Sequence, residues 1–166
     1  MKGENKVPTM GKLIRNGGWL LFLLFLCGCE GDPKPVVAYH AFDGHSWGRF
    51  DKITFSPAVE KPGEVDVVLF ACFTPGFSYE TLDFNMVMSS PAGEERIREY
   101  RLKVKDAGGA FLRGCTGDSC YAEISLKKGM RIGKPGNLSI EIENLTPRIT
   151  TEGMLGLGIR LERSAK

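Results

Sequence analysis

Cysteine offers the most specific chemistry in this sequence, and Cys29 stands at the most informative position. The stretch Leu26-Cys27-Gly28-Cys29 resembles the bacterial lipobox, in which a branched apolar residue, a small residue and Gly or Ala precede the modified cysteine. There the thiol takes a diacylglycerol in thioether linkage, and the cysteine becomes the mature N-terminus. Two or more acyl chains give lasting attachment to a bilayer. The sequence therefore predicts lipidation of Cys29 and a membrane contact made through that lipid.

Two alternatives compete with this interpretation. Cys27 could accept the lipid, but the preceding Leu24-Phe25-Leu26 places bulky residues where the signal peptidase needs small ones. The segment could instead stay as an uncleaved anchor helix. Its apolar run from Trp19 to Leu26 is short, however, beside the roughly 20 residues that cross a bilayer.

Cys115 and Cys120 flank a loop that contains Gly, Asp and Ser, and an exported protein allows their oxidation. A disulfide between them would stabilise the fold by roughly 2 kcal/mol. Two free thiols in a mobile loop are the alternative, because spacing alone does not establish a pairing. Cys72 lies in the most apolar stretch and is expected to be a small buried hydrophobic residue.

Residues for catalysis or metal binding are much harder to find. His40 and His45 lie close together, but their spacing matches no helical or hairpin pattern of metal ligands. The sequence lacks a Gly-x-Ser-x-Gly elbow, a phosphate-binding Gly-rich loop and a His-Glu-x-x-His motif. We therefore expect no catalytic residue, no metal and no cofactor, and a protein that is not an enzyme.

The segments that present these residues begin with a secretory signal peptide. Basic residues precede the apolar run and small residues follow it, as is typical of such a peptide. We expect a lipoprotein signal peptide over 1–28, a lipidated polar tether over 29–35 and one domain over 36–166. Because Glu30 rather than Asp follows the lipidated cysteine, the usual signal for inner-membrane retention is missing. The outer membrane is the expected location, on its periplasmic or its surface face.

The mature chain is close to electrically neutral. The sequence has 22 Lys and Arg residues and 20 Asp and Glu residues, and four of the basic and one of the acidic residues precede Cys29. Opposite charges are interspersed, whereas a nucleic-acid partner calls for a clustered basic face. The composition argues against nucleic acid as a partner.

From Val36 onward the hydrophobic period is two. The stretch 138–143 alternates strictly, which predicts a strand with Leu138, Ile140 and Ile142 in the core and Glu141 and Glu143 toward water. Comparable runs occupy 36–42, 53–59, 65–73, 82–86, 100–105, 122–126 and 155–161, and 65–73 is apolar on both faces, as in a central strand covered from both sides. Turn signals separate them. These patterns predict an all-β, two-sheet antiparallel sandwich, jelly-roll-like, with about eight strands.

The order of motifs from Val36 to Glu162 resembles the gliding-motility lipoprotein family GldH of the Bacteroidetes. The motifs are Trp47 with Asp51, Tyr79-Glu80-Thr81-Leu82, Pro91-x-Gly93, Glu99-Tyr100-x-Leu102, Asp106-x-x-Gly109-x-Phe111-x-x-Gly114 and Gly153-x-Leu155-x-x-Gly158-Ile159-Arg160-Leu161-Glu162. The last two are the most specific. The sequence departs from the family in Phe111, where Trp is common, and in its cysteine loop.

This resemblance implies a lipid-anchored envelope protein that acts as an accessory or scaffold in gliding motility or in the associated surface-protein machinery. It supplies no catalytic residue. Fold and family likeness alone do not establish a function. The predicted partners are the membrane, through the lipid on Cys29, and another protein of the envelope.

Aromatic residues suggest two kinds of binding surface. Phe77, Tyr79 and Phe111, beside Gly-rich turns, could dock another envelope protein, or they could simply pack in the core and turns. The alternative function is a carbohydrate-binding sandwich on the cell surface, which would need two or three coplanar exposed rings on one face. Tyr39, Trp47 and Tyr121 are the candidates for those rings.

Overall fold

A computed structural model describes residues 34–164 of the chain. The predicted signal peptide, Cys29 and most of the predicted tether lie outside this range. Within it the chain forms strands, and the single helical element is the 3-10 turn η2 (Asp43–His45). None of the described segments forms a helix long and apolar enough to cross a membrane.

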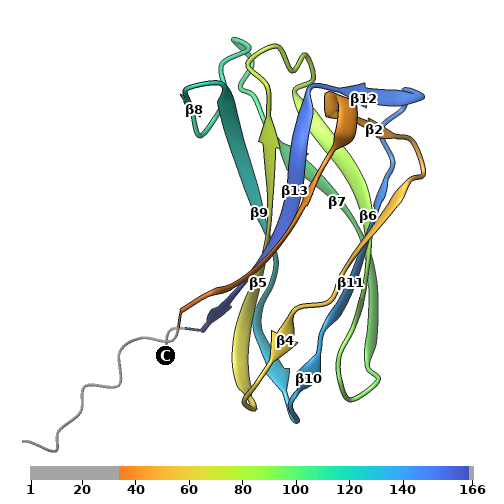
Figure 1. Cartoon of the computed structure of the whole chain (residues 1–166), viewed down its shortest axis with the longest axis vertical. Helices are drawn as coiled ribbons and strands as arrows, with labels where there is room; N and C mark the ends of the chain where they lie inside the picture. The colour runs from red at the N-terminus through yellow and green to blue at the C-terminus, as the bar shows by residue number, and fades with distance from the viewer. Residues whose placement is uncertain (1–33, 165–166) are drawn as a thin grey trace, which may run out of the picture. The chain divides into compact units, whose positions relative to one another are not determined.

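Two antiparallel sheets make up the fold (Figure 1). The larger sheet has the order β1-β13-β5-β9-β8 and consists of β1 (Val36–Ala41), β13 (Met154–Arg163), β5 (Gly63–Phe73), β9 (Ser119–Ile132) and β8 (Cys115–Thr116). The smaller sheet has the order β3-β11-β6-β7 and consists of β3 (Lys52–Phe55), β11 (Ser139–Asn144), β6 (Thr81–Ser89) and β7 (Glu95–Lys103). We call them the β5 sheet and the β6 sheet.

Two short strand pairs lie at the two ends of the sandwich (Figure 1). At one end β2 (Ser46–Gly48) pairs with β12 (Thr150–Glu152), and at the other β4 (Ala58–Val59) pairs with β10 (Gly136–Asn137). β1 begins at Val36, which pairs with Leu161 of β13. The described chain therefore enters the fold beside the end of its C-terminal strand.

The predicted fold class is confirmed. Seven of the eight predicted runs each overlap one of the longer strands, whereas the run 53–59 divides into β3 of the β6 sheet and β4, which pairs with β10. Counting β3, four of these eight strands lie in each of the two larger sheets of the described residues. Strand β7 begins at Glu95, five residues earlier than its alternation predicts, because its first half has exposed Ile97 among charged residues. It is an edge strand, so charges there also protect the sheet from pairing with another chain.

The core lies between the two sheets. Ile140 and Ile142 of β11 and the preceding Leu138 are fully buried, whereas Glu141 and Glu143 are partly exposed, which confirms the predicted strand faces. The register pairs Ile140 with Met88 and Ile142 with Met86, so apolar side chains of neighbouring strands share the inner face. A one-residue slip would turn all of them outward.

Strand β5 is central, as predicted, but its outer face has a different cover from the one expected. Val67, Leu69 and Ala71 face the core and are fully buried. On the outer face, Phe70 is half-buried. Its partner there is the ring of Tyr39 from β1, in the same sheet, rather than a second layer of structure. The apolar run in β5 therefore reflects a surface feature as well as the core.

A buried polar cluster attaches the β2–β12 pair to β11. Asn144 is fully buried, and its amide nitrogen donates to the backbone carbonyls of Trp47 (3.0 Å) and Gly48 (3.1 Å). Its side-chain oxygen accepts from the backbone nitrogen (2.9 Å) and the hydroxyl (2.6 Å) of Thr146. Thr151 completes the cluster. Because buried polar groups are costly when unpaired, this satisfied cluster fixes how the pair is placed.

Candidate functional site

The residues expected to dock a protein form an internal cluster at one end of the sandwich. Phe77 is only 1% exposed, and its ring lies 4.3 Å from that of Phe73 and 5.2 Å from that of Tyr79. Tyr79 and Phe111 are partly buried against the same core. Phe77 cannot contact a partner from this position, which corrects the prediction of a docking surface made of these three residues.

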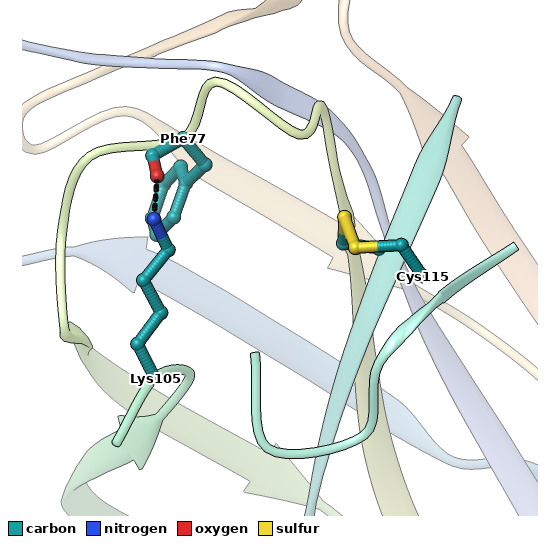
Figure 2. The surroundings of a disulfide bond; sticks show 4 residues. Phe77, Lys105 and Cys115 are labelled. Atoms are coloured by element: carbon teal, nitrogen blue, oxygen red, sulfur yellow. Dashed lines mark hydrogen bonds between the residues drawn. A yellow bond between two sulfur atoms is a disulfide. The ribbon is translucent and has the colours of Figure 1, made fainter. Parts of the chain in front are cut away.

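One charged residue, Lys105, lies within this cluster, where its ammonium group makes two contacts. Its ammonium group donates to the backbone carbonyl of Phe77 and lies 4.7 Å from the centre of the Phe111 ring (Figure 2). A cation over an aromatic face is attracted by the ring's quadrupole. The lysine therefore links the segment after β5 to the loop after β7, which is a packing role.

Cys115 and Cys120 form a disulfide across the β8–β9 hairpin, and Figure 2 shows it beside the Lys105 cluster. The two residues pair directly in the register, and Thr116 pairs with Ser119, which leaves a two-residue turn. Cys120 is buried while Cys115 is exposed. The bond therefore attaches an exposed loop at the edge of the β5 sheet to a buried strand position. The third cysteine of the described residues, Cys72, is free and buried.

The outer face of the β5 sheet has two aromatic rings that lie over glycines. The register aligns Tyr39 of β1, Gly158 of β13 and Phe70 of β5 in one row across the sheet. The rings of Tyr39 and Phe70 are 6.1 Å apart between centres and only 6° from parallel. We call this pair the aromatic plate.

Glycine lets both rings of the plate lie close to the strand, because any Cβ there would make a ring shift. A Cβ on Gly158 would lie 2.7 Å from Cε1 and 2.8 Å from Cε2 of Phe70, and a Cβ on Gly156 would lie 2.7 Å from Cε2 of Tyr39. Real Cβ contacts are not this short. The two glycines of β13 therefore leave the space in which both rings rest against the sheet, and Gly158 belongs to the C-terminal motif recognised in the sequence.

Burial raises the pKa of two groups at the plate, the Tyr39 phenol and the Cys72 thiol. The pKa of the Tyr39 phenol is raised, first by its partial burial and then by the adjacent Cys72 thiol. The pKa of Cys72 is also raised by burial, and only partly lowered by a hydrogen bond with Tyr39. Both groups stay protonated at neutral pH, so the plate is an uncharged surface.

A line of charged residues borders the plate. Glu123 of β9 contacts two arginines, Arg113 at 2.5 Å and Arg160 at 3.1 Å. Arg160 also donates to Glu162 at 2.5 Å. Partial burial lowers the pKa of Arg160, but the two carboxylates outweigh this and raise it. Two positive and two negative side chains thus form one chain of ion pairs, which we call the ion-pair chain.

Between the plate and the ion-pair chain lies a shallow, open hollow of about 380 Å³. We call it the ring hollow. Its lining includes Val37, Phe70, Arg113, Tyr121, Glu123 and Arg160. Tyr121 is 43% exposed and Tyr39 is 50% exposed, so both phenols reach the solvent on this face. The volume is within the usual range of small-ligand sites.

The ring hollow contains part of what the sequence suggested. Of the three rings named for carbohydrate binding, Tyr39 and Tyr121 share this face. Trp47 is 2% exposed and packs against Phe42 at 5.5 Å, so its inclusion was wrong. Phe70 takes its place on the face. The sequence contained a signal for this residue, because glycines at two alternate positions of an otherwise apolar strand indicate a close approach.

The two histidines do not form a metal site. His40 and His45 are both exposed, and residues 34–164 contain no group of three His, Cys, Asp or Glu side chains placed to hold a metal ion. The ring of His40 instead packs edge-on against Phe42 at 5.1 Å. Its role is therefore one of surface packing.

The fold and its surfaces define the class: a jelly-roll β-sandwich whose two sheets present very different outer faces. The sequence model of the family described as "GldH lipoprotein" matches residues 36–161. The chain therefore belongs to the GldH lipoprotein family, and it is a lipid-anchored protein of the cell envelope. The match confirms the resemblance found in the sequence.

Other comparisons contribute little. No protein of curated function matches the sequence. Among solved structures, a chain of infectious bursal disease virus, Gx strain, is 13% identical with a TM-score of 0.37, covering 93% of this chain and 37% of the viral chain. The VP2 subviral particle of that virus is 12% identical with a TM-score of 0.39, and the match covers 83% of this chain and 40% of the viral chain. Eiger TNF from S. frugiperda is 8% identical with a TM-score of 0.32, and the match covers 79% of this chain and 88% of the Eiger chain. The chain spans less than half of the two viral chains, and these low scores carry no argument.

Proposed function

We propose that this protein is held at the outer membrane by a lipid on Cys29 and acts there, without catalysis, as an accessory or scaffold protein. Its setting is gliding motility or the machinery that handles surface proteins. The observation that carries the proposal is the family match, because residues 36–161 cover nearly all of the described sandwich. We infer contact with another envelope protein from this setting, and we assign no specific site to that contact.

The length of the tether supports a role close to the membrane. Strand β1 begins at Val36, only seven residues after Cys29. A fully extended segment of that length reaches at most about 25 Å. A lipid on Cys29 would therefore keep the sandwich within about one domain diameter of the bilayer surface. This short reach suits a component of a membrane assembly better than a freely ranging binding protein.

Lipidation can be tested in the native host by metabolic labelling with palmitate. The wild-type protein and the Cys27→Ala variant should both take up the label and fractionate with the outer membrane. The Cys29→Ala variant should lose the label and leave the membrane fraction. Retained label in Cys29→Ala together with loss in Cys27→Ala would move the anchor to Cys27.

The role itself is tested by deleting the gene and measuring colony spreading and the display of surface adhesins. We expect both to fall, and we expect the wild-type gene but not the Cys29→Ala gene to restore them. Crosslinking in the same cells should recover a defined envelope protein. Normal spreading and normal adhesin display in the deletion strain, together with no specific crosslink in wild-type cells, would contradict the proposal.

A further inference from the structure

The aromatic plate is already arranged for a flat ligand before anything binds. The rings of Tyr39 and Phe70 are nearly parallel, and both lie close against the strand beneath them because no Cβ occupies positions 156 and 158. Rings that are fixed in the free protein lose little freedom when a ligand stacks on them. Such a surface favours a rigid, flat, partly apolar partner.

The ion-pair chain supplies unused hydrogen-bond donors at the edge of this plate. An arginine side chain has five N–H donors. Arg160 uses its Nε for Glu162 and one terminal nitrogen for Glu123, and Arg113 reaches Glu123 through one terminal nitrogen. Both arginines line the hollow, and these contacts leave most of their N–H groups without a partner among the described residues. Because each charge has an opposite partner, these donors come without a surplus of charge.

The two features together match the surface of a sugar ring. A pyranose has an apolar face of C–H groups, which stacks on an aromatic ring, and a perimeter of hydroxyl groups, which donate and accept hydrogen bonds. The plate meets the first requirement. Arg113, Glu123 and Arg160 meet the second, with donors and a carboxylate acceptor on the same hollow. The balanced charges favour a neutral sugar over an anionic one.

A protein partner fits this surface less well. A stable protein–protein interface buries about 800 Å² on each partner, whereas the feature that sets this face apart is a hollow of about 380 Å³ lined by seven residues. That is the size of a small-ligand site. The edge strand β1 exposes Val36 and Val37, and the ring of its Tyr39 packs beside that of Phe70. Tighter binding of a polypeptide than of a sugar would oppose the inference.

We propose that the ring hollow and the adjoining aromatic plate bind a neutral saccharide chain. One pyranose unit stacks on Phe70, with Arg113, Glu123 and Arg160 bonding its hydroxyls, and the next unit stacks on Tyr39. The proposal goes beyond the motility role, since it assigns a ligand class to a surface of this chain. It needs no lipid on Cys29, so it can fail or succeed independently of the proposed function.

The test is a binding titration with the full-length lipoprotein. The detergent must have no sugar headgroup, for example lauryldimethylamine oxide, because a glycosidic detergent would compete for the hollow. The neutral probes are cellohexaose and chitohexaose, hexagalacturonate is the acidic probe, and an extended hexapeptide of alternating Thr and Val is the polypeptide probe. For a shallow, open site we expect a Kd on the order of 1 mM for at least one neutral probe.

The deciding variants change one ring at a time. Phe70→Ala should weaken binding of the neutral probe by about tenfold or more, because it removes the apolar contact under one sugar unit. Phe70→Leu guards against a folding defect, since it keeps apolar bulk and removes only the flat ring. It should weaken binding similarly. Glu123→Gln should cause a smaller loss, about threefold, because an amide oxygen still accepts a hydrogen bond.

A matched control lies on the other sheet. Ile97 is 65% exposed on β7, and Ile97→Ala removes an exposed apolar side chain far from the hollow, so it should leave the Kd unchanged. The Cys29→Ala variant should also bind normally. The inference is overturned if neither neutral probe binds at about 10 mM, a concentration that detects even weak sites. It is also overturned if the acidic or the peptide probe binds more tightly, or if Ile97→Ala weakens binding as much as Phe70→Leu does.

Discussion

The two sheets share one core but present opposite outer faces to the solvent. On the β6 sheet, Lys52 pairs with Glu141 at 2.9 Å, and Arg101 makes a two-point contact with Asp83 at 2.8 Å. These are pairs between neighbouring strands, and they leave a face on which charged side chains surround the exposed Ile97. On the β5 sheet, two rings lie over glycines beside a hollow.

The difference shows which face has features that solubility alone does not require. A charged outer face is what an antiparallel sandwich needs in water. The exposed Tyr39 ring beside the half-buried Phe70 ring, the glycines of β13 and the partly buried Arg160 each depart from that pattern, and they occur together on one face. A cluster of such exceptions is best explained by binding.

Removing the disulfide should have the largest effect on stability. Replacing Cys115 and Cys120 together by Ser should lower the free energy of unfolding by about 2 kcal/mol, because the unfolded chain regains the freedom of a short loop. Denaturant unfolding with and without a thiol reductant measures this. The reductant should destabilise the wild type and leave the double variant unchanged. Equal curves for wild type and variant would show that the bond does not hold the hairpin.

Matched arginine deletions compare the two sets of ion pairs. Arg160→Ala should lower stability by about 1 kcal/mol, because Arg160 is 28% exposed and its loss leaves Glu162 without its partner and Glu123 with Arg113 alone. Arg101→Ala should change the unfolding midpoint by no more than the experimental error, since Arg101 is 72% exposed in its ion pair. If the two variants lose equal stability, the faces do not differ in this respect.

A glycine pair tests the space under the plate. Gly158→Ala should displace the Phe70 ring and lower stability by about 1 kcal/mol, the overpacking outweighing what a strand gains when glycine is replaced. Gly133→Ala is the control, because nothing lies within 4 Å of a Cβ there. Thermal unfolding and the near-ultraviolet spectrum follow both changes. An unchanged aromatic spectrum in Gly158→Ala would mean that the ring does not rest on this glycine.

The smallest effect concerns pH. The raised pKa of Tyr39 means that the unfolded protein loses this proton more readily than the folded one. Its contribution to stability is complete below the ordinary phenol pKa of about 10 and is lost as the pH rises through the higher folded value. Between about pH 9 and about pH 11, wild type should therefore lose more stability than Tyr39→Phe. Identical losses would contradict the burial of this phenol.

Strand positions could be predicted from the sequence because alternation reports burial directly. The pattern of 138–143 was sufficient to place Ile140 and Ile142 in the core and Glu141 outside it. The start of β7 was missed because an edge strand with charges on both faces has no hydrophobic period. Prediction of a strand from the sequence therefore depends on whether one of its faces is buried.

The candidate site was less accessible from the sequence. An aromatic residue near a Gly-rich turn can pack inward or outward, and Phe77 and Trp47 both pack inward. Phe70 drew no attention within an apolar strand, and the ion-pair chain joins Arg113, Glu123 and Arg160 across three separate segments. Such contacts depend on the strand order of the sheet, which local patterns do not encode.

The central claim is that the outer face of the β5 sheet is the binding surface of this lipoprotein, and amide chemical-shift mapping with cellohexaose and chitohexaose tests it most directly. The account predicts shifts at Phe70, Tyr121, Gly156 and Gly158 with at least one of these probes, and none at Asn85, Val87 or Ile97 on the β6 sheet. Shifts confined to the β6 sheet, or no shifts at a saturating concentration of either probe, would contradict it.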